Sequence, residues 1–277
     1  MQADDAIRIF SALGHGPRLA IFRLLARRAP DALRPTEIAA ICGLKPNTLS
    51  AHLSTLSETG LLTVRRAGTS LYYGLDHARM AAFTSYLLDD CCRGRPDLCN
   101  FPRHSERPRT PPYKVLFICT GNSARSILAE ALLRKADPDR FETYSAGVRP
   151  TGTIQPQVIA LLARSGVDVS LLRSKDLSEM QLPDAPQFDF VFTVCDHAAN
   201  EECPVWPGHP VSAHWGLPDP AAVHGTLAKT GLAYAEAYRT LNTRIQAFAA
   251  LPLAALDSLS LQAAADRIGT IIPEGVQ

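Results

Sequence analysis

The stretch that decides the fold is VLFICTGNSARS, residues 115–126. It opens as a short apolar run, as buried parallel strands do, and continues into a loop of small polar residues between Cys119 and Arg125. Because a helix is predicted to begin within a few residues, the loop N–H groups and the helix N-terminus should point at one spot and attract an anion. The planar guanidinium of Arg125 matches a tetrahedral oxyanion. The residues assigned to this oxyanion site are Thr120, Gly121, Asn122, Ser123, Ala124, Arg125 and Ser126.

Cys119 is the candidate nucleophile of this loop. We expect the positive surroundings to lower its pKa, so that it is a thiolate at neutral pH. The hydroxyl of Ser126 could hydrogen-bond that thiolate, and Asn122 is placed to fix the shape of the loop. A free cysteine at a strand end is often only a small core residue. The strand before Cys119, and the arginine and helix after it, favour the catalytic interpretation.

The chain after residue 112 alternates predicted strands and helices. Strands are expected at residues 114–119, 142–145, 188–195 and 211–215, and helices at residues 127–135, 156–164 and 231–250. This alternation predicts an α/β domain with a doubly wound parallel sheet and helices on both faces. Because the carboxyl ends of parallel strands share one edge, residues that follow different strands can form one site there.

The loop VLFICTGNSARS resembles the signature loop of the low-molecular-weight protein tyrosine phosphatase fold, which also includes thiol-dependent arsenate reductases. The resemblance covers roughly residues 114–250. It implies that an aspartate followed by proline acts as general acid, and Asp219-Pro220 in AHWGLPDPA matches that pattern. A predicted strand leads into this segment, so Asp219 is expected to reach the Cys119 loop. Asp-Pro is otherwise a common turn sequence.

Two further cysteines separate a reductase from a phosphatase. Cys195 and Cys203 bracket CDHAANEEC, and Cys195 follows the predicted strand FDFVFTV at the same sheet edge as Cys119. Phosphatases of this fold usually carry an aromatic residue after Asp-Pro, whereas this chain has Ala221. A phosphatase needs one thiol, but a reductase needs electrons, which protein thiols supply in pairs through disulfide exchange. The bracketed segment resembles the redox loop of arsenate reductases of this fold.

The resemblance implies that Cys119 attacks arsenate while Asp219 protonates the departing oxygen. A disulfide relay through Cys195 and Cys203 would then release arsenite. No tightly bound cofactor is implied. Some thioredoxin-coupled members have a slightly shorter gap between the two relay cysteines than this chain has. The spacing therefore leaves two external reductants open: thioredoxin, or glutathione with glutaredoxin. Two alternatives remain: a DNA-binding regulator with a phosphatase module, and a repressor whose C-terminal domain binds an oxyanion without turnover.

The first part of the chain is predicted to form a helix-turn-helix. Ile7, Phe10 and Leu13 are expected to be the apolar stripe of a first helix. Further on, a short helix ends at Gly43, and Pro46 stands at the start of the next helix. The apolar stripe of that second helix consists of Leu49, Leu53 and Leu56. The following LLTVRRAGTSLYYGL predicts a two-stranded hairpin.

Residues 6–90, with the motif LKPNTLSAHLSTLSETGLLTVRRAGTSLYYGL, resemble the winged-helix repressors of the arsenic-responsive ArsR family. The resemblance implies operator DNA as a partner and a homodimer formed through the N-terminal domain. The side chains expected to reach bases or phosphates lie around the second helix and in the hairpin. They are Lys45, Asn47, Thr48, Ser50, His52, Arg65 and Arg66. A winged helix used only for protein contacts is the alternative.

A cluster of cysteines follows the winged helix in CCRGRPDLC. Cys91, Cys92 and Cys99 resemble one arrangement of the arsenite sensor in that family, and arsenite takes three thiolates. Zinc would prefer four ligands, and only His104 is a near candidate for the fourth. Three unpaired surface thiols at a linker are the remaining interpretation. We expect arsenite to be the inducer that binds these three cysteines.

Charge is distributed unevenly along the 277 residues. Residues 1–112 contain 15 Lys and Arg against 10 Asp and Glu, whereas the rest contains 13 against 17. The basic first part favours a polyanionic partner. The Pro- and Arg-rich residues 93–112 are predicted to be a linker. The expected organisation is a DNA-binding domain at 1–92, this linker, a reductase-like or phosphatase-like domain at 113–252, and a tail of unknown role at 253–277.

The sequence contains no recognisable signal peptide or membrane-spanning stretch. We therefore expect a cytoplasmic chain without a membrane partner. In that reducing compartment the seven cysteines are expected to be thiols rather than structural disulfides.

Overall fold

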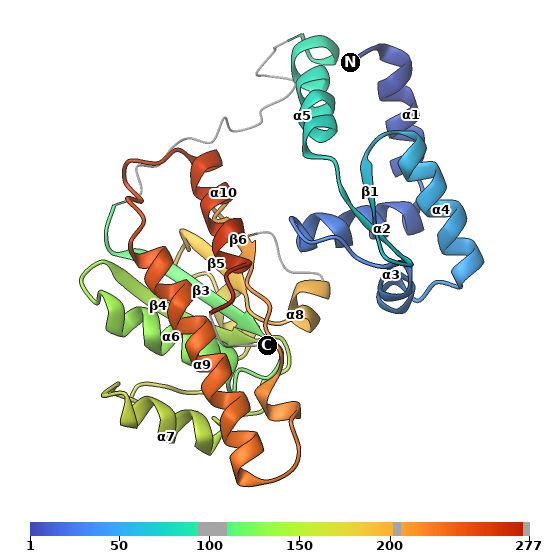
Figure 1. Ribbon diagram of the computed structural model, residues 1–277. Coiled ribbons are helices and arrows are strands. Elements are labelled where there is room, and N and C mark those ends of the chain that lie inside the picture. Colours follow the sequence, from blue (N-terminus) through green and yellow to red (C-terminus); the bar gives the residue numbers. More distant parts are fainter. Residues whose placement is uncertain (94–109, 202–205, 274–277) are drawn as a thin grey trace. The chain divides into compact units, whose positions relative to one another are not determined.

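The computed structural model describes residues 1–93, 110–201 and 206–273 (Figure 1). The chain divides into two compact units, Met1–Ser105 and Glu106–Gln277. Each unit has its own buried apolar core. Within the described residues, none of the helices combines the length and the apolar character that crossing a bilayer requires.

The first unit consists of helices, an antiparallel hairpin and a closing helix (Figure 1). Its elements are α1 (Ala3–Leu13), α2 (Gly16–Arg28), α3 (Pro35–Cys42), α4 (Pro46–Glu58), β1 (Leu62–Ala67), β2 (Ser70–Leu75), α5 (His77–Ser85) and the π-helix η1 (Tyr86–Cys91).

The predicted helix-turn-helix is confirmed, and its turn has a clear physical cause. Gly43 ends α3 in the left-handed conformation, with φ of 64°, which glycine adopts without steric cost. Both α3 and α4 have proline at the start of the helix, where the missing N–H is not needed. The leucine stripe Leu49, Leu53 and Leu56 is buried in the core of this unit, as expected. The opposite face of α4 is therefore available to a partner.

The expectation for the first helix was wrong in register. Ile7 and Phe10 are exposed by 59% and 49%, while Ala6, Ile9 and Ala12 face the core. The inward face of α1 therefore combines two alanines with Ile9, one position away from the stripe expected from Ile7 and Phe10. The ring of Phe10 nevertheless packs edge to face against that of Phe83, with ring centres 5.2 Å apart.

The second unit is built on a parallel sheet whose described strands have the order β4-β3-β5-β6. The strands are β3 (Tyr113–Cys119), β4 (Phe141–Gly147), β5 (Phe190–Thr193) and β6 (Val211–His214). Because all neighbours are parallel, their carboxyl ends share one edge, where Cys119 pairs with Gly147 and Thr193 with His214. The strand order reverses between β3 and β5, which is where sheets of this kind bind ligands.

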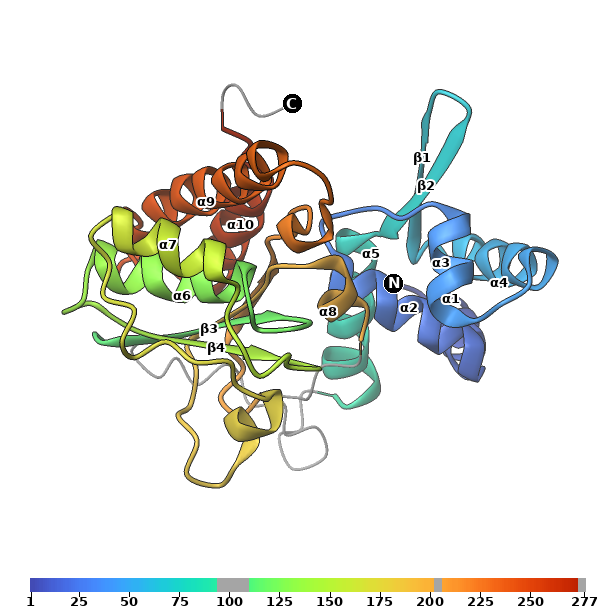
Figure 2. The same ribbon diagram turned by 90° about the horizontal axis from the view of Figure 1, so that it is seen from below.

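Helices cover this sheet, and the predicted α/β fold is confirmed. They are α6 (Arg125–Ala136), α7 (Pro156–Arg164), α8 (Asp196–Asn200), α9 (Leu227–Ala249) and α10 (Ser258–Gly269), with 3₁₀ turns η2 (Leu177–Gln181) and η3 (Pro220–Ala222). Helices α6, α7, α9 and α10 gather on one face and η2 lies on the other (Figure 2). Aromatic rings fill the space between strands and helices; Phe192 stacks on Trp215 with ring centres 4.1 Å apart.

Residues 258–269, which the sequence left as part of a tail of unknown role, form a helix that packs on β6. Asp257 caps this helix α10 by accepting the N–H of Ser260. The indole N–H of Trp215 donates to the carbonyl of Ala265 at 2.9 Å. The helix therefore completes the core beside the last strand, and the segment that follows that strand leads to the candidate site.

Candidate active site and DNA-binding surface

The loop after β3 is fixed by hydrogen bonds from its carbonyl groups to the segment after β4. The carbonyl oxygens of Cys119, Thr120 and Gly121 accept N–H groups from the segment after β4, at 2.9 to 3.1 Å. Asn122 adopts the left-handed conformation with φ of 43°, which asparagine tolerates better than most residues. The loop thus turns its carbonyls away from the cysteine and leads into the N-terminus of α6. This arrangement suits an anion.

The sulfur of Cys119 is buried and hydrogen-bonded at the base of this loop. It lies 2.9 Å from the hydroxyl oxygen of Ser126 and accepts the backbone N–H of Asn122 at 3.1 Å. Burial raises the pKa of Cys119 more than the hydrogen bonds from Ser126 and the loop backbone lower it, and the neighbouring Cys195 raises it further. The expectation of a lowered pKa for Cys119 was therefore wrong. The cause is desolvation, which the sequence pattern does not reveal.

Arg125 and Asp219 meet across the site. The side chain of Arg125 is largely buried, and its guanidinium binds the carboxylate of Asp219 at 2.9 Å and the carbonyl of Leu217 at 3.1 Å. Asp219 reaches this position because the chain continues from the carboxyl end of β6 and forms the cap of η3. An oxyanion that took the place of the Asp219 carboxylate on Arg125 would leave the Asp219 side chain beside the bound anion.

Cys195 lies next to the same loop. It follows β5, it is 1% exposed, and its sulfur is 3.3 Å from the hydroxyl oxygen of Thr120. The sulfur also accepts the N–H of Ala198 at the start of α8. The sheet therefore brings together Cys119, Arg125, Cys195 and Asp219, as the sequence predicted for one edge. Cys203 lies outside the described residues.

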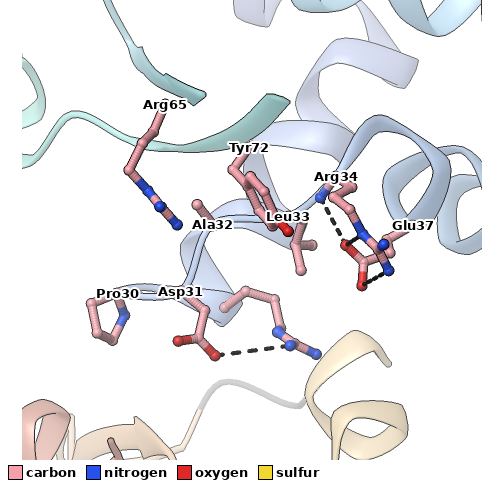
Figure 3. Close-up of a pocket in the computed structure, with 9 residues that line it drawn as sticks. Pro30, Asp31, Ala32, Leu33, Arg34, Glu37, Arg65 and Tyr72 are labelled. Atoms are coloured by element: carbon pink, nitrogen blue, oxygen red, sulfur yellow. Dashed lines mark hydrogen bonds and ion pairs between the residues drawn. The ribbon is translucent and has the colours of Figure 1, made fainter. Parts of the chain in front are cut away.

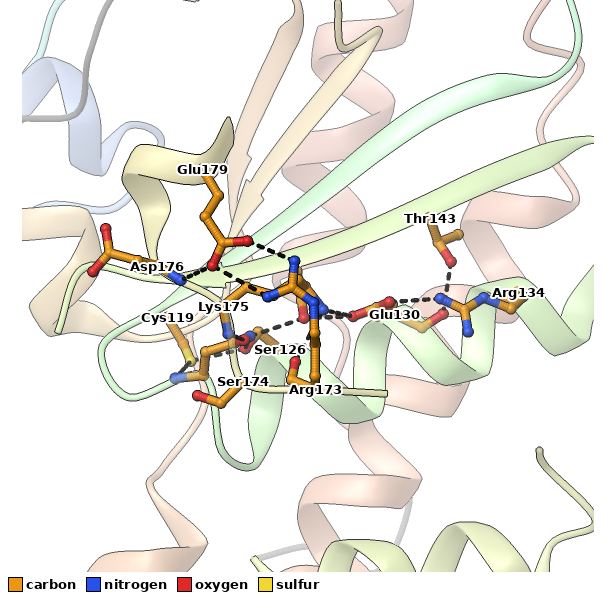
Figure 4. A network of polar contacts seen from close by, with 12 residues as sticks. Cys119, Ser126, Glu130, Arg134, Thr143, Arg173, Ser174, Lys175, Asp176 and Glu179 are labelled. Carbon is orange, nitrogen blue, oxygen red and sulfur yellow. Dashed lines mark hydrogen bonds and ion pairs between the residues drawn. The ribbon is translucent and has the colours of Figure 1, made fainter. Parts of the chain in front are cut away.

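Four side chains around the site were missed by sequence reasoning. Three of them, Ser145 on β4, Glu130 on α6 and Lys175 before η2, continue the hydrogen-bonded chain that starts at the sulfur. Figure 4 shows Glu130 and Lys175 together with Cys119 and Ser126. On the other side, Tyr234 of α9 is buried, and burial followed by the charge of Asp219 raises its pKa. No motif links these positions, which are separated along the chain and meet only in the folded sheet.

Gly147 offers a test of how tightly the loop is packed. A methyl group at this position would lie 2.7 Å from the carbonyl oxygen of Thr120, which is backbone and cannot move aside. We expect Gly147→Ala to lower the free energy of unfolding by about 1–3 kcal/mol, as overpacking does. The measurement is urea unfolding followed by circular dichroism.

The matched control for this substitution is Gly231→Ala on α9. A methyl group there would meet no atom within 4 Å, and alanine favours a helix over glycine. We expect that variant to be as stable as the original chain or more stable. Equal stability of the Gly147→Ala and Gly231→Ala variants would show that the loop is not packed against β4 as described.

The candidate DNA-binding side chains divide into two groups. Lys45, Asn47, Thr48 and Ser50 are exposed on or beside the start of α4. His52 is half-buried, its ring lies 5.0 Å from that of His15, and burial followed by the charges of His15 and Arg18 lowers its pKa. It is therefore less available to DNA than the other four.

The two arginines of the hairpin also differ. Arg65 places its guanidinium 5.1 Å from the ring centre of Tyr72. Both side chains line a cavity of about 540 Å³ beside the hairpin (Figure 3). The cavity is also lined by Arg28, Pro30, Asp31, Ala32, Leu33, Arg34 and Glu37. Arg66 is exposed, and successive strand residues point to opposite faces, so it is the freer of the two.

The candidate sensor cysteines are only partly described. Cys91 is an exposed free thiol at the end of η1, whereas Cys92 is disulfide-bonded. Cys99 and His104 lie outside the described residues. The expectation that all cysteines are thiols was therefore wrong for Cys92, and this bond would have to be reduced before the sulfur could hold arsenite. The described residues contain no group of three or more His, Cys, Asp or Glu that could bind a metal ion.

Comparison with known proteins places each half of the chain. Residues 114–259 match the family model of the low molecular weight phosphotyrosine protein phosphatases, and residues 7–65 match that of a helix-turn-helix domain. An arsenate reductase of Shouchella clausii is 35% identical over 135 residues, which are 49% of this chain and 94% of that relative. The arsenate reductase of Bacillus subtilis is 33% identical over the same shares.

A solved structure is also similar to this chain. A thioredoxin-dependent arsenate reductase of Corynebacterium glutamicum is 29% identical, with a TM-score of 0.35, over 50% of this chain and 63% of that one. The phosphatase family model covers more than half of the chain, and the arsenate reductases are matched over almost their whole length. The chain therefore belongs to the low molecular weight phosphotyrosine protein phosphatase family, where its relatives include arsenate reductases, and it carries a helix-turn-helix domain ahead of that part.

Proposed function

We propose that this chain is an arsenic-responsive transcriptional repressor joined to an arsenate reductase. The observation that carries the reductase half is the position of a second thiol at the oxyanion loop: Cys195 lies against Thr120, one residue from Cys119. Its arsenate reductase relatives support the same activity. In this proposal the C-terminal domain makes arsenite, and the N-terminal domain responds to it by releasing DNA.

The first step is the attack of Cys119 on arsenic. Arsenate occupies the loop and displaces Asp219 from Arg125. Because burial raises the pKa of Cys119, its proton has to leave during binding, and an arsenate oxygen is the adjacent base. A sulfur–arsenic bond forms and an arsenic–oxygen bond breaks; that oxygen leaves as water, and Asp219, released from Arg125, passes to it the proton that the thiol gave up.

The following steps move two electrons from thiols to arsenic. The Cys195 thiolate attacks the sulfur of Cys119; a disulfide forms, the electron pair of the sulfur–arsenic bond stays on arsenic, and arsenite leaves. Cys203 then attacks Cys195, which frees Cys119 and leaves a Cys195–Cys203 disulfide. Thioredoxin, or glutathione with glutaredoxin, reduces that disulfide. A reducing compartment such as the cytoplasm suits this cycle.

Phosphatase activity is the second candidate, because the family model carries that name. Cys119, Arg125 and Asp219 would suffice for it. However, a phosphatase has no use for Cys195, and Ala221 after Asp219-Pro220 offers no ring to flank a phenyl group. Hydrolysis of an aryl phosphate without arsenate reduction would favour this candidate.

The repressor half is supported by charge and exposure. Lys45, Asn47, Thr48 and Ser50 lie exposed around α4, and Arg66 on the hairpin adds a positive charge. The exposed apolar face of α1, with Ile7 and Phe10, suits contact with a second copy, so we propose a homodimer formed by this domain. Cys91, Cys92 and Cys99 are the proposed arsenite ligands.

The test of the reductase half is turnover of the purified chain with arsenate. NADPH consumption would be followed with thioredoxin and its reductase, and separately with glutathione, glutaredoxin and glutathione reductase. We expect turnover with one of the two systems, which identifies the reductant. Absence of turnover with both, in protein whose thiols are intact, would contradict the proposal.

The DNA half predicts a specific role for Arg66. A duplex selected from random sequences by the protein itself serves as the operator probe. We expect Arg66→Ala to weaken binding several-fold and to reduce the slope of log affinity against log salt by about one, as loss of one phosphate contact does. Fluorescence anisotropy at several salt concentrations measures both quantities. Arg65→Ala is the matched control, because Arg65 lies over Tyr72; an unchanged salt slope for Arg66→Ala would rule out the contact.

A further inference from the structure

A buried ion pair lies behind the Cys119 loop. The ammonium of Lys175 is 3.0 Å from a carboxylate oxygen of Glu130, and the two side chains are only 8% and 4% exposed (Figure 4). Taking two charges out of water is costly, and apolar residues of similar size are often as stabilising as a buried ion pair. The position of this pair therefore calls for a reason other than stability.

The pair belongs to a continuous chain of hydrogen bonds that ends at the sulfur. Ser145 lies 2.5 Å from the same oxygen of Glu130 that Lys175 binds. The amide nitrogen of Asn122 is 2.8 Å from the hydroxyl oxygens of both Ser145 and Ser126. Ser126 in turn lies 2.9 Å from the Cys119 sulfur.

The direction of each hydrogen bond in this chain follows from its partners. The side-chain oxygen of Asn122 accepts the backbone N–H of Lys175 at 2.6 Å, which fixes the amide so that its nitrogen faces the two serines. That nitrogen has two hydrogens and donates one to each serine. Each serine oxygen is then an acceptor, and its own hydrogen has to go elsewhere.

The two ends of the chain take those hydrogens. An ionised carboxylate only accepts, so Ser145 donates to Glu130. Lys175 and Arg134 both face the Glu130 carboxylate, at 3.0 Å and 2.5 Å. At the other end Ser126 donates to Cys119, and a donor aimed at sulfur favours the thiolate over the thiol.

We propose that Glu130 and Lys175 are positioning residues that set the direction of this hydrogen-bonded chain and thereby help Cys119 to ionise. Glu130 accepts the hydroxyl hydrogen of Ser145, so the oxygen of Ser145 is left to accept a hydrogen from the Asn122 amide. Lys175, together with Arg134, neutralises Glu130 through its side chain, and Lys175 also holds the Asn122 amide through its backbone N–H. This role rests on the nucleophilic Cys119 of the proposed function, but it concerns the thiol alone and can be measured without arsenate.

Among the described residues, three influence the ionisation of the Cys119 sulfur directly. Ser126 contacts it from α6, the backbone of Asn122 from the loop, and Cys195 from the end of β5. Burial raises the pKa of Cys119, and the hydrogen bond from Ser126 is the largest influence in the opposite direction. Weakening the donor at Ser126 should therefore raise the pKa further.

The test replaces the ion pair by apolar residues of similar size in the full chain, as Glu130→Leu with Lys175→Met. The rate of alkylation of Cys119 by iodoacetamide is measured against pH, by mass spectrometry of the Cys119 peptide, in a buffer free of oxyanions. We expect the pKa to rise by about half a unit to one unit, so that the rate at pH 7 falls about threefold to tenfold. The control Lys114→Gln removes a surface ion pair with Glu142 at the opposite end of β3 from Cys119 and should leave the profile unchanged.

A second variant covers the case in which the double variant does not fold, as judged by circular dichroism. Ser145→Ala cuts the chain between Glu130 and Asn122 without removing a charge, and we expect it to produce the same rise in pKa. A folded Ser145→Ala or Glu130→Leu/Lys175→Met protein with the original profile would overturn the proposal and make the pair purely structural. Because the assay contains no arsenate, failure of the reductase proposal would not affect this result.

Discussion

Cys119→Ser is expected to abolish arsenate reduction and, with it, the release of DNA by arsenate, while DNA release by arsenite persists. A serine hydroxyl in place of the sulfur cannot enter a disulfide, so the two electrons that arsenic needs have no route to it. Loss of a catalytic nucleophile lowers turnover by roughly a thousandfold or more. The arsenite response is expected to survive because its proposed ligands, Cys91, Cys92 and Cys99, belong to a different part of the chain.

Both responses can be measured on one preparation. The labelled operator duplex is bound to the protein, and anisotropy is followed after addition of arsenate with a complete reducing system, or of arsenite with the same system. The reductant matters because Cys92 is disulfide-bonded in the structure and has to be a thiol before it can bind arsenite. The control is Cys42→Ser, which removes a half-buried thiol whose pKa is raised by burial. We expect that variant to retain both responses.

Two outcomes would contradict this prediction in different ways. If arsenate still releases DNA from Cys119→Ser protein with no other reductase present, the C-terminal domain does not produce the inducer. If Cys119→Ser also removes the response to arsenite, the loop around Cys119 takes part in sensing, and the assignment of sensing to the cysteines after η1 is wrong.

The fold could be predicted from the sequence where a local pattern of residues determines an element. The helix predicted at residues 156–164 has those bounds in the structure, and Gly43 ends α3 where a left-handed residue was needed. Local patterns failed where packing between elements decides the outcome. Ile7 and Phe10 have helical spacing, yet the face of α1 that packs inward carries Ala6, Ile9 and Ala12. Likewise, α10 is recognisable as part of the core only through its contacts with β6 and Trp215.

The candidate site shows the same division. Parallel strands place Cys119, Cys195 and Asp219 at one edge, and this could be predicted because strand direction alone determines it. The ionisation of Cys119 could not, since it depends on how deeply the sulfur is buried and on which hydrogens reach it. Lys175 and Glu130 are 45 positions apart and share no motif, so only the folded structure shows that they meet.

The second large effect is expected from the relay cysteines, and the two substitutions should stop the cycle at different points. Cys195→Ser removes the thiol that attacks Cys119, so arsenic stays bound to Cys119 and no arsenite is released. Cys203→Ser leaves that attack intact, so each chain releases one arsenite and stops as a Cys119–Cys195 disulfide. Multiple turnover should fall in both variants by roughly a thousandfold or more, as for other catalytic groups that act as a unit.

The amount of arsenite per chain distinguishes these two arrests. Pre-reduced, desalted protein is mixed with excess arsenate, and arsenite is quantified by chromatography with arsenic-specific detection while disulfides are mapped by mass spectrometry. The geometry supports attack by Cys195 before Cys203, because Cys195 is buried beside the Cys119 loop. Its sulfur lies only 3.3 Å from the hydroxyl oxygen of Thr120. Cys91→Ser is the control, since it removes an exposed thiol of the proposed sensor and should leave turnover unchanged. Stoichiometric arsenite from Cys195→Ser would place the first disulfide elsewhere, and the function of Cys195 at this edge would then have to be structural.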